Sequence, residues 1–247
     1  MSGSVERVPT AAIVVIGDEI LSGKTEDTNT PFLLRELRAL GVAVRRVAVV
    51  ADVEADIAAE IRRVQPAFDH VFTSGGVGPT HDDVTIVAIA AALERPIVRS
   101  PEIVAVMNAL WQPVKETHLR MADIPFGAEL VYGGALRFPL LRLENIYIFP
   151  GVPEIFREKF VAVREHFRAT PFHLTRVYST YGEGHLVPLM NEIVARHPGV
   201  SVGSYPTISH DEYRVMVTFE SKDEAAVSQA VRSFLSLVGE PGVWKVA

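Results

Sequence analysis

The sequence predicts an α/β fold with a mostly parallel sheet, followed by a smaller α+β unit. Two observations carry this prediction. Over residues 10–170, short β-branched runs alternate with stretches of helical period, which is the pattern of βαβ units with right-handed crossovers. From residue 171 onward the order becomes strand, helix, two strands and helix, which is typical of a split βαβ unit. A chain of 247 residues is long enough to hold both.

The first strand is predicted at residues 11–17. Its sequence, AAIVVIG, is apolar at successive positions and therefore indicates burial on both faces. A loop follows, and Thr30-Pro31 begins a helix, because Thr is a good N-cap and Pro is favoured in the first turn. Gly41 ends that helix.

Two further strand–helix pairs follow. Residues 42–50 form the second strand, and Asp52 is predicted to cap a helix over residues 53–64. Residues 69–73 form a third strand, which runs directly into a glycine-rich loop, and a helix follows over residues 84–93.

The rest of the first unit has weaker patterns. Ser100-Pro101 begins a helix that reaches about residue 110. Residues 111–136 are rich in Pro and Gly and show only an edge strand at residues 129–132. The strand NIYIF ends at residue 149, and a helix follows from about residue 152 to 167.

We predict three segments: a disordered N-terminus at residues 1–9, a larger domain at 10–170 and a small α+β domain at 171–247. In the small domain we expect strands at residues 173–181, 200–205, 213–220 and 242–246, and helices at residues 183–197 and 222–238.

Composition excludes several classes of protein. A net charge of −6 gives no strong attraction to nucleic acid or to anionic membranes, so neither is an expected partner. The chain has no cysteine, which excludes disulfides, thiolate metal sites and a cysteine nucleophile and fits a cytoplasmic protein. No apolar run approaches the ~20 residues that span a bilayer, and no signal peptide begins the chain.

Polar loops leave the carboxyl ends of the three predicted strands, at residues 17–29, 51–52 and 74–83. Ligands of parallel sheets bind at this edge, so we expect the polar residues of these loops to converge on a site.

The loop SGGVGPTHDD, residues 74–83, carries the strongest functional signal. Its glycines let the backbone approach an anion, and the following helix adds its positive N-terminal end. Thr80 supplies a hydroxyl, and Asp82 and Asp83 supply oxygen ligands that suit Mg²⁺. We favour a site for a phosphate and a cation over a tight turn in which the aspartates only cap the helix.

The other candidate site residues each have a functional and a purely structural interpretation. The segment from Gly17 to Thr25 resembles a phosphate-binding P-loop, but five residues separate its glycines where that motif needs four. Asp18 and Glu19 suit a metal or a ligand hydroxyl, or belong to a solvated loop. Asn29 suits the edge of a base or pterin, or a helix cap.

Asp52 is either a helix cap only or a third carboxylate beside Asp82 and Asp83. Gly151 and Glu154 belong to a strand-to-helix turn that either serves only the fold or brings the backbone close to a ligand.

Four segments together resemble the molybdopterin-binding (MoaB/Mog-like, MoCF biosynthesis) domain family, and most closely its CinA-like members and the N-terminal half of eukaryotic-type FAD synthase. These segments are GDEILSG at 17–23, DTN at 27–29, TSGGVGPTHDDVT at 73–85 and FPGVPE at 149–154. The resemblance covers about residues 10 to 220. It implies a three-layer α/β/α sandwich, a small second domain and a homo-oligomer, either a dimer or a trimer.

The resemblance also implies site residues. It assigns a divalent metal ion (Mg²⁺, Mn²⁺ or Co²⁺) to Asp52, Asp82 and Asp83, which are also the catalytic candidates. It assigns phosphate to Ser74, Gly75, Gly76 and Thr80. The remaining candidates for ligand binding are Asp18, Glu19, Asn29, Gly78, Gly151 and Glu154.

The activity expected first is that of a metal-dependent nucleotide pyrophosphatase acting on FAD, ADP-ribose or a relative. The alternatives are adenylylation of molybdopterin, with molybdopterin as the ligand, and a non-catalytic module that binds a pterin or nucleotide. The sequence contains neither the amidase domain of CinA nor the adenylyl-transferring half of FAD synthase. Deamidation of nicotinamide nucleotides and synthesis of FAD are therefore not expected.

Overall fold

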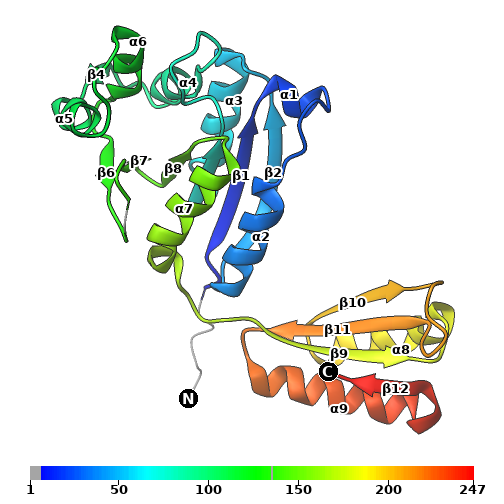
Figure 1. Cartoon of the computed structure of the whole chain (residues 1–247). Coiled ribbons are helices and arrows are strands. Elements are labelled where there is room, and N and C mark those ends of the chain that lie inside the picture. The colour runs from blue at the N-terminus through cyan, green and yellow to red at the C-terminus, as the bar shows by residue number, and fades with distance from the viewer. Residues whose placement is uncertain (1–6, 135) are drawn as a thin grey trace, which may run out of the picture. The chain divides into compact units, whose positions relative to one another are not determined.

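A computed structural model describes residues 7–134 and 136–247 of the chain. The chain divides into two units, Met1–Ala169 and Thr170–Ala247, and Figure 1 shows their elements. The strands of the first unit are β1 (Thr10–Ile16), β2 (Ala43–Val50), β3 (His70–Ser74), β4 (Ile97–Arg99), β5 (Asp123–Pro125), β6 (Glu129–Val131), β7 (Leu140–Leu143) and β8 (Ile146–Phe149). Its helices are α1 (Asp18–Leu21), α2 (Asn29–Ala39), α3 (Glu54–Val64), α4 (Thr85–Ala92), α5 (Pro101–Leu110), α6 (Glu116–Leu119), η1 (Arg120–Ala122), α7 (Pro153–Val163) and η2 (Arg164–Phe167).

The central sheet of the first unit has the order β2-β1-β3-β8-β7-β6. Strands β2, β1, β3 and β8 run parallel to one another. Strands β7 and β6 follow at one edge of the sheet, and each pairs antiparallel with its neighbour. Helices α2 and α7 cover one face of the sheet, and α3 and α4 cover the other (Figure 1). The predicted three-layer α/β/α sandwich with a mostly parallel sheet is therefore confirmed. All residues of β1 after Thr10 are buried, as expected of a strand covered on both faces.

Two of the predicted helix caps are wrong. Helix α2 begins one residue before Thr30, and its first N–H groups, those of Asn29 and Thr30, donate to Asp27 Oδ1 at 3.0 Å each. Helix α3 begins at Glu54 without a side-chain cap. Asp52 Oδ2 accepts instead from Asp18 N at 2.8 Å, because the fold brings the loops after β1 and β2 together.

Much of the segment at residues 111–136, for which the sequence predicted only an edge strand at 129–132, joins β4 and the predicted helix α5 in a small substructure. Strands β4 and β5 pair antiparallel, and β4 lies beside α5 and α6 in Figure 1. A separate cluster of buried side chains, centred on Ile103, Met107, Ala122 and Ile124, packs these elements together. Each element is short, so its formation depends on this packing more than on a local periodic pattern.

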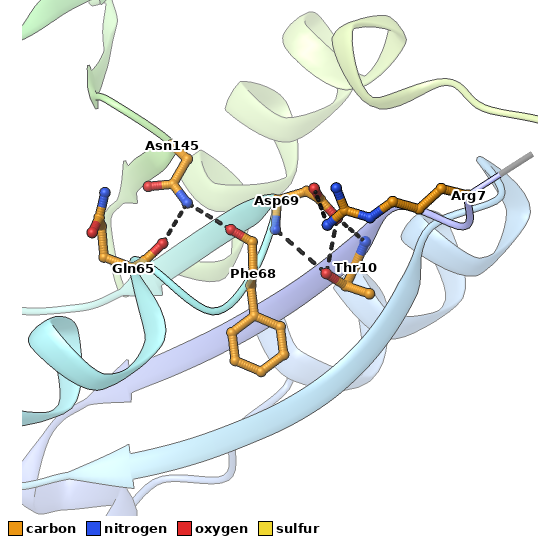
Figure 2. A network of polar contacts seen from close by, with 6 residues as sticks. All are labelled: Arg7, Thr10, Gln65, Phe68, Asp69 and Asn145. Atoms are coloured by element: carbon orange, nitrogen blue, oxygen red, sulfur yellow. Dashed lines mark hydrogen bonds and ion pairs between the residues drawn. The ribbon is translucent and has the colours of Figure 1, made fainter.

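Hydrogen bonds fix the strands at the amino ends of β1, β3 and β8 (Figure 2). Asp69 Oδ2 accepts from Thr10 N at 2.8 Å and from Thr10 Oγ1 at 2.9 Å. Asn145 Nδ2 donates to the carbonyls of Gln65 at 2.9 Å and of Phe68 at 2.7 Å. These contacts connect the strand starts to the loop after α3, opposite the carboxyl ends.

The described part of the predicted N-terminal segment adds to this edge. Residues 1–6 of that segment lie outside the described residues. Arg7 Nη2 lies 2.9 Å from Asp69 Oδ1, and the carbonyl of Pro9 accepts from Ala43 N at 2.9 Å.

The second unit consists of β9 (His173–Ser179), α8 (Glu183–Arg196), β10 (Ser201–Pro206), β11 (Val215–Ser221), α9 (Glu224–Val238), η3 (Glu240–Gly242) and β12 (Val243–Val246). Its sheet has the order β10-β11-β9-β12, and all neighbouring strands are antiparallel. Strands β9 and β10 are thus parallel with β11 between them, which is the predicted split βαβ arrangement. Helices α8 and α9 lie on one face of this sheet and enclose a separate core (Figure 1).

Among the described residues, no helix combines the length and the apolar character needed to span a membrane.

Candidate functional site

Four loops meet at one edge of the central sheet. Because β2, β1, β3 and β8 are parallel neighbours, their carboxyl ends lie side by side. The sequence predicted three of these loops, and the loop after β8, which contains Gly151, is the fourth. This edge is where parallel sheets bind ligands.

The glycine loop begins with two residues that only glycine accommodates. Gly75 has a φ of +109°, and a Cβ there would lie 2.1 Å from the carbonyl oxygen of Ile16. Gly76 has a φ of +64°, and its Cβ would lie 2.3 Å from Thr85 Oγ1. Thr85 Oγ1 in turn donates to the carbonyl of Gly75 at 2.9 Å. The loop backbone therefore packs directly against β1 and the start of α4.

The second half of the loop is held by Asp83. Asp83 Oδ2 accepts from Thr80 N at 2.8 Å and also from the Thr80 hydroxyl. Arg120 Nη1 also donates to the carbonyl of Thr80 at 2.8 Å. One oxygen of Asp83 is therefore already engaged in shaping the loop.

The middle of the loop offers backbone donors. Within the described part of the chain, the N–H groups of Gly76, Val77 and Gly78 have no hydrogen-bond partner. Gly75 differs, since its N–H donates to the carbonyl of Phe149 at 3.2 Å. Consecutive unpaired N–H groups before a helix N-terminus are a suitable site for an anion such as phosphate.

Asn29 connects three of the loops. Its side chain is 5% exposed, and Nδ2 donates to Ser74 Oγ at 3.0 Å and to the carbonyl of Gly151 at 2.8 Å. Its Oδ1 is buried without a partner among the described residues. A small pocket of about 60 Å³ adjoins Asn29 and includes Glu19 and Asp27, so it has room for small polar molecules such as water. Asn29 and Ser74 thus join the loops and line this pocket.

Four carboxylates gather beside the loop, and we call Asp18, Glu19, Asp52 and Asp82 the carboxylate cluster. The pKa of Asp52 is raised, mainly by burial and further by the negative charges of the other three, while the N–H of Asp18 opposes this rise. Mutual repulsion of this kind is relieved by a bound cation.

The carboxylate cluster suits a hard cation in its chemistry but does not form a complete ligand set. No three acidic or histidine side chains in residues 7–134 and 136–247 come together as metal ligands. A Mg²⁺ ion commonly takes only one or two carboxylates and completes its shell with water and substrate phosphates. The cluster fits that mode. Asp83, predicted as one of three metal ligands, accepts from Thr80 with one of its two oxygens, Oδ2.

Two predicted residues lie further out. Glu154 is exposed in the first turn of α7, where its negative charge interacts favourably with the positive N-terminal end of the helix. The Asp82 side chain is 61% exposed and faces His81, whose ring is 97% exposed. Both carboxylates are therefore accessible to a ligand.

No pattern in the sequence predicted the cavity that adjoins the glycine loop. It measures about 300 Å³ and shares Gly78 and Asp83 with the glycine loop, and its other walls include Trp111, Phe138 and Lys159. Its residues come from distant segments, which explains why no local motif announced it.

The sequence did contain one indication of this cavity, which is the position of Lys159. It follows Phe156 by three residues and precedes Val163 by four, so it occupies the apolar face of α7. It is 7% exposed, and Nζ donates to the carbonyls of Phe138 and Pro139 at 2.7 Å each. Burial lowers the pKa of Lys159 to about 8.

Comparison with known proteins agrees with this architecture. Residues 171–246 match the family described as FAD synthase, middle domain. A protein of Archaeoglobus fulgidus is 32% identical over 228 residues, which cover 92% of this chain and 97% of that protein. A probable FAD synthase of Caenorhabditis briggsae is 33% identical over 262 residues, which cover 93% of this chain and 50% of that protein. The chain thus spans half the length of this relative.

A solved structure supports the fold of the first unit. The crystal structure of the protein CinA with unknown function from Thermoplasma acidophilum aligns with a TM-score of 0.60 and 28% identity. The alignment covers 65% of this chain and 99% of that one. Residues 12–168 match the family described as probable molybdopterin binding domain, and the chain belongs to that family.

Proposed function

We propose that the chain is a metal-dependent nucleotide pyrophosphatase that acts on FAD, ADP-ribose or a related dinucleotide. The observation that carries this proposal is the position of the unpaired N–H groups of Gly76, Val77 and Gly78 beside the carboxylate cluster. Diphosphates need donors for their oxygens and a counter-charge, and this edge of the sheet offers both. The similarity to a probable FAD synthase supports a dinucleotide substrate.

The residues divide the work as follows. The Thr80 hydroxyl donates its one proton to Asp83 and so helps to shape the loop. The loop N–H groups would hold the diphosphate, and Asp52 and Asp82 would hold Mg²⁺, Mn²⁺ or Co²⁺. A divalent cation bound there neutralises phosphate charge and lowers the pKa of an attacking water. Asp83 keeps the loop in shape through Thr80.

The reaction is hydrolysis of the bridging bond of the diphosphate. The oxygen of one water forms a bond to a phosphorus, and the bond from that phosphorus to the bridging oxygen breaks. The bridging oxygen leaves on the other phosphate, and the water's protons pass to solvent. FAD would give AMP and FMN, and ADP-ribose would give AMP and ribose 5-phosphate.

The test is release of AMP from FAD or ADP-ribose with each of the three metals, followed by chromatography. Asp52→Asn removes one negative charge of the cluster and should reduce the rate at least ~10-fold. Asp56→Asn is the matched control, because Asp56 is exposed in the first turn of α3. Absence of AMP with every metal, or equal rates for the two variants, would refute the proposal.

A second function, adenylylation of molybdopterin, is favoured by the family match of residues 12–168. The same assay with ATP and molybdopterin separates the two, since the transferase yields adenylylated molybdopterin. Tight binding without turnover would leave a non-catalytic module that binds a pterin or nucleotide. The predicted dimer or trimer is measured on the same preparation by light scattering.

A further inference from the structure

The cavity beside the glycine loop is placed to receive a part of the ligand other than its phosphates. Gly78 and Asp83 belong both to the loop and to the wall of the cavity. A ligand whose diphosphate lies on the loop therefore has the cavity as a neighbouring compartment. Its volume of about 300 Å³ is at the lower end of pockets that bind small molecules, ~300–1,000 Å³.

The walls of the cavity suit a flat apolar group. Trp111 and Phe138 stack with ring centroids 5.8 Å apart and an angle of 19° between planes. Aliphatic side chains complete the wall, among them Ile86, Met121, Leu141 and Ile148. Aromatic and aliphatic surfaces of this kind bind the faces of planar rings.

The wall also presents a cation with an uncommitted donor. An ammonium group has three N–H bonds. Among the described residues, Lys159 Nζ donates to the carbonyls of Phe138 and Pro139, which leaves one N–H for another acceptor. If Lys159 served only to bind these two carbonyls, two of its three N–H groups would be explained. Its position on the wall of an open cavity would not be.

We propose that this cavity binds the isoalloxazine ring of a flavin, with Lys159 as a specificity-determining residue that donates to a ring carbonyl. The inference rests on the proposed function, because it assigns the second half of the dinucleotide at the same site. Three fused rings fill more of the cavity than a purine does. The pyrimidine edge of a flavin carries two carbonyl oxygens, whereas the exocyclic amine of adenine would direct N–H groups at the ammonium.

The first test uses riboflavin, which has the ring but no phosphate, and measures quenching of flavin fluorescence on titration with the full chain. Ile155 lines the cavity and is 43% exposed, so Ile155→Trp narrows the cavity without replacing a core residue. Val161 is 54% exposed on the same helix and is not part of the wall, so Val161→Trp is the matched control. We expect Ile155→Trp to weaken riboflavin binding at least ~10-fold and Val161→Trp to leave it unchanged.

The second test separates recognition by Lys159 from a purely structural role. Lys159→Met should weaken riboflavin several-fold while the affinity for adenosine stays the same, a change of ratio that general loosening would not produce. No riboflavin binding, equal affinity in the two tryptophan variants, or an equal loss for both ligands in Lys159→Met would overturn the proposal.

These outcomes are distinct from failure of the proposed function. Riboflavin binding that responds to Ile155→Trp, without release of AMP from FAD, would retain the ring site and reject the hydrolase. Release of AMP with a KM for FAD that Ile155→Trp does not change would retain the hydrolase and reject the ring site.

Discussion

Replacing Lys159 with methionine should remove an increase in stability that the wild-type protein gains under alkaline conditions. The pKa of Lys159 falls from 10.5, its ordinary value, to about 8 in the folded protein because the side chain is buried. Below the folded pKa both states carry the proton, and the folded state bears the cost of burying the charge. Between the two pKa values the unfolded state binds more protons, so the free energy of unfolding rises with pH.

The expected size follows from the two pKa values. Between about pH 7 and about pH 9.5, nearly the whole gain comes from loss of the Lys159 proton in the folded state while the unfolded lysine remains charged. Each pH unit in this range contributes at most ~1.4 kcal/mol, and integration gives about 2 kcal/mol. Methionine cannot titrate, so the variant lacks this gain.

The assay is urea denaturation at the two pH values, followed by tryptophan fluorescence. The two tryptophans, Trp111 and Trp244, lie in different units, so Trp244→Phe serves as the background in which fluorescence reports on the first unit alone. Lys24→Met, at an exposed lysine, is the control for removal of a charge. Parallel pH profiles for Lys159→Met and its parent would refute the reasoning, because Lys159 would then titrate alike in both states.

Three further predictions concern stability. Gly75→Ala should destabilise the protein by about 3 kcal/mol in thermal unfolding, against about 1 kcal/mol for Gly23→Ala, because both have positive φ but only Gly75 lacks room for a Cβ. Equal losses would contradict the close backbone contact. Asn29→Ala should cost about 2 kcal/mol in urea unfolding, because it removes one buried and one partly buried hydrogen bond. A neutral result would mean that the loops hold together without it. Asp69→Asn should cost about 1–2 kcal/mol near neutral pH. The N–H of Thr10 lowers the pKa of Asp69, so the difference between wild type and variant should shrink as pH falls below 3.8, and a difference that persists in acid would contradict the assignment.

The sequence predicted the fold well where its patterns were local. The apolar run that became β1 arises from burial of that strand on both faces, and helix α2 keeps Leu33 and Leu37 on its one buried side. From residue 171 onward the order of predicted elements changes to strand, helix, two strands and helix. This change correctly predicted a second unit of split βαβ type. In each case the physical cause acts over a few residues, so the pattern is visible without the fold.

The caps show where local reasoning fails. Asp52 and Thr30 both have side chains that suit an N-cap. Asp52 was drawn to the N–H of Asp18, 34 residues away in sequence, and Asp27 supplied the cap that Thr30 was expected to provide. A side chain that can satisfy several donors takes the one that the tertiary structure brings near, and sequence spacing alone does not reveal it.

The candidate site also has one part that local sequence patterns revealed and one part that depends on the tertiary structure. The glycine loop was recognisable because close backbone contacts restrict Gly75 and Gly76 to glycine. The cavity with Trp111, Phe138 and Lys159 was not, since its walls combine part of the glycine loop with side chains from segments far away in the sequence. Lysine on the apolar face of a helix is the kind of local conflict that marks such a place.

The paired aspartates of the loop illustrate how one motif can contain two functions. Asp82 and Asp83 are adjacent, and as a sequence they suggest a single metal-binding pair. In the fold, Oδ2 of Asp83 accepts from Thr80, and the exposed Asp82 adds a smaller negative contribution to the surroundings of Asp52. Asp83 therefore contributes to the shape of the loop that carries the N–H groups of Gly76 and its neighbours, and Asp82 adds to the negative charge of the carboxylate cluster. Under the proposed function, the two consecutive aspartates therefore contribute differently to one site, Asp83 to the shape of the loop and Asp82 to the negative charge beside it.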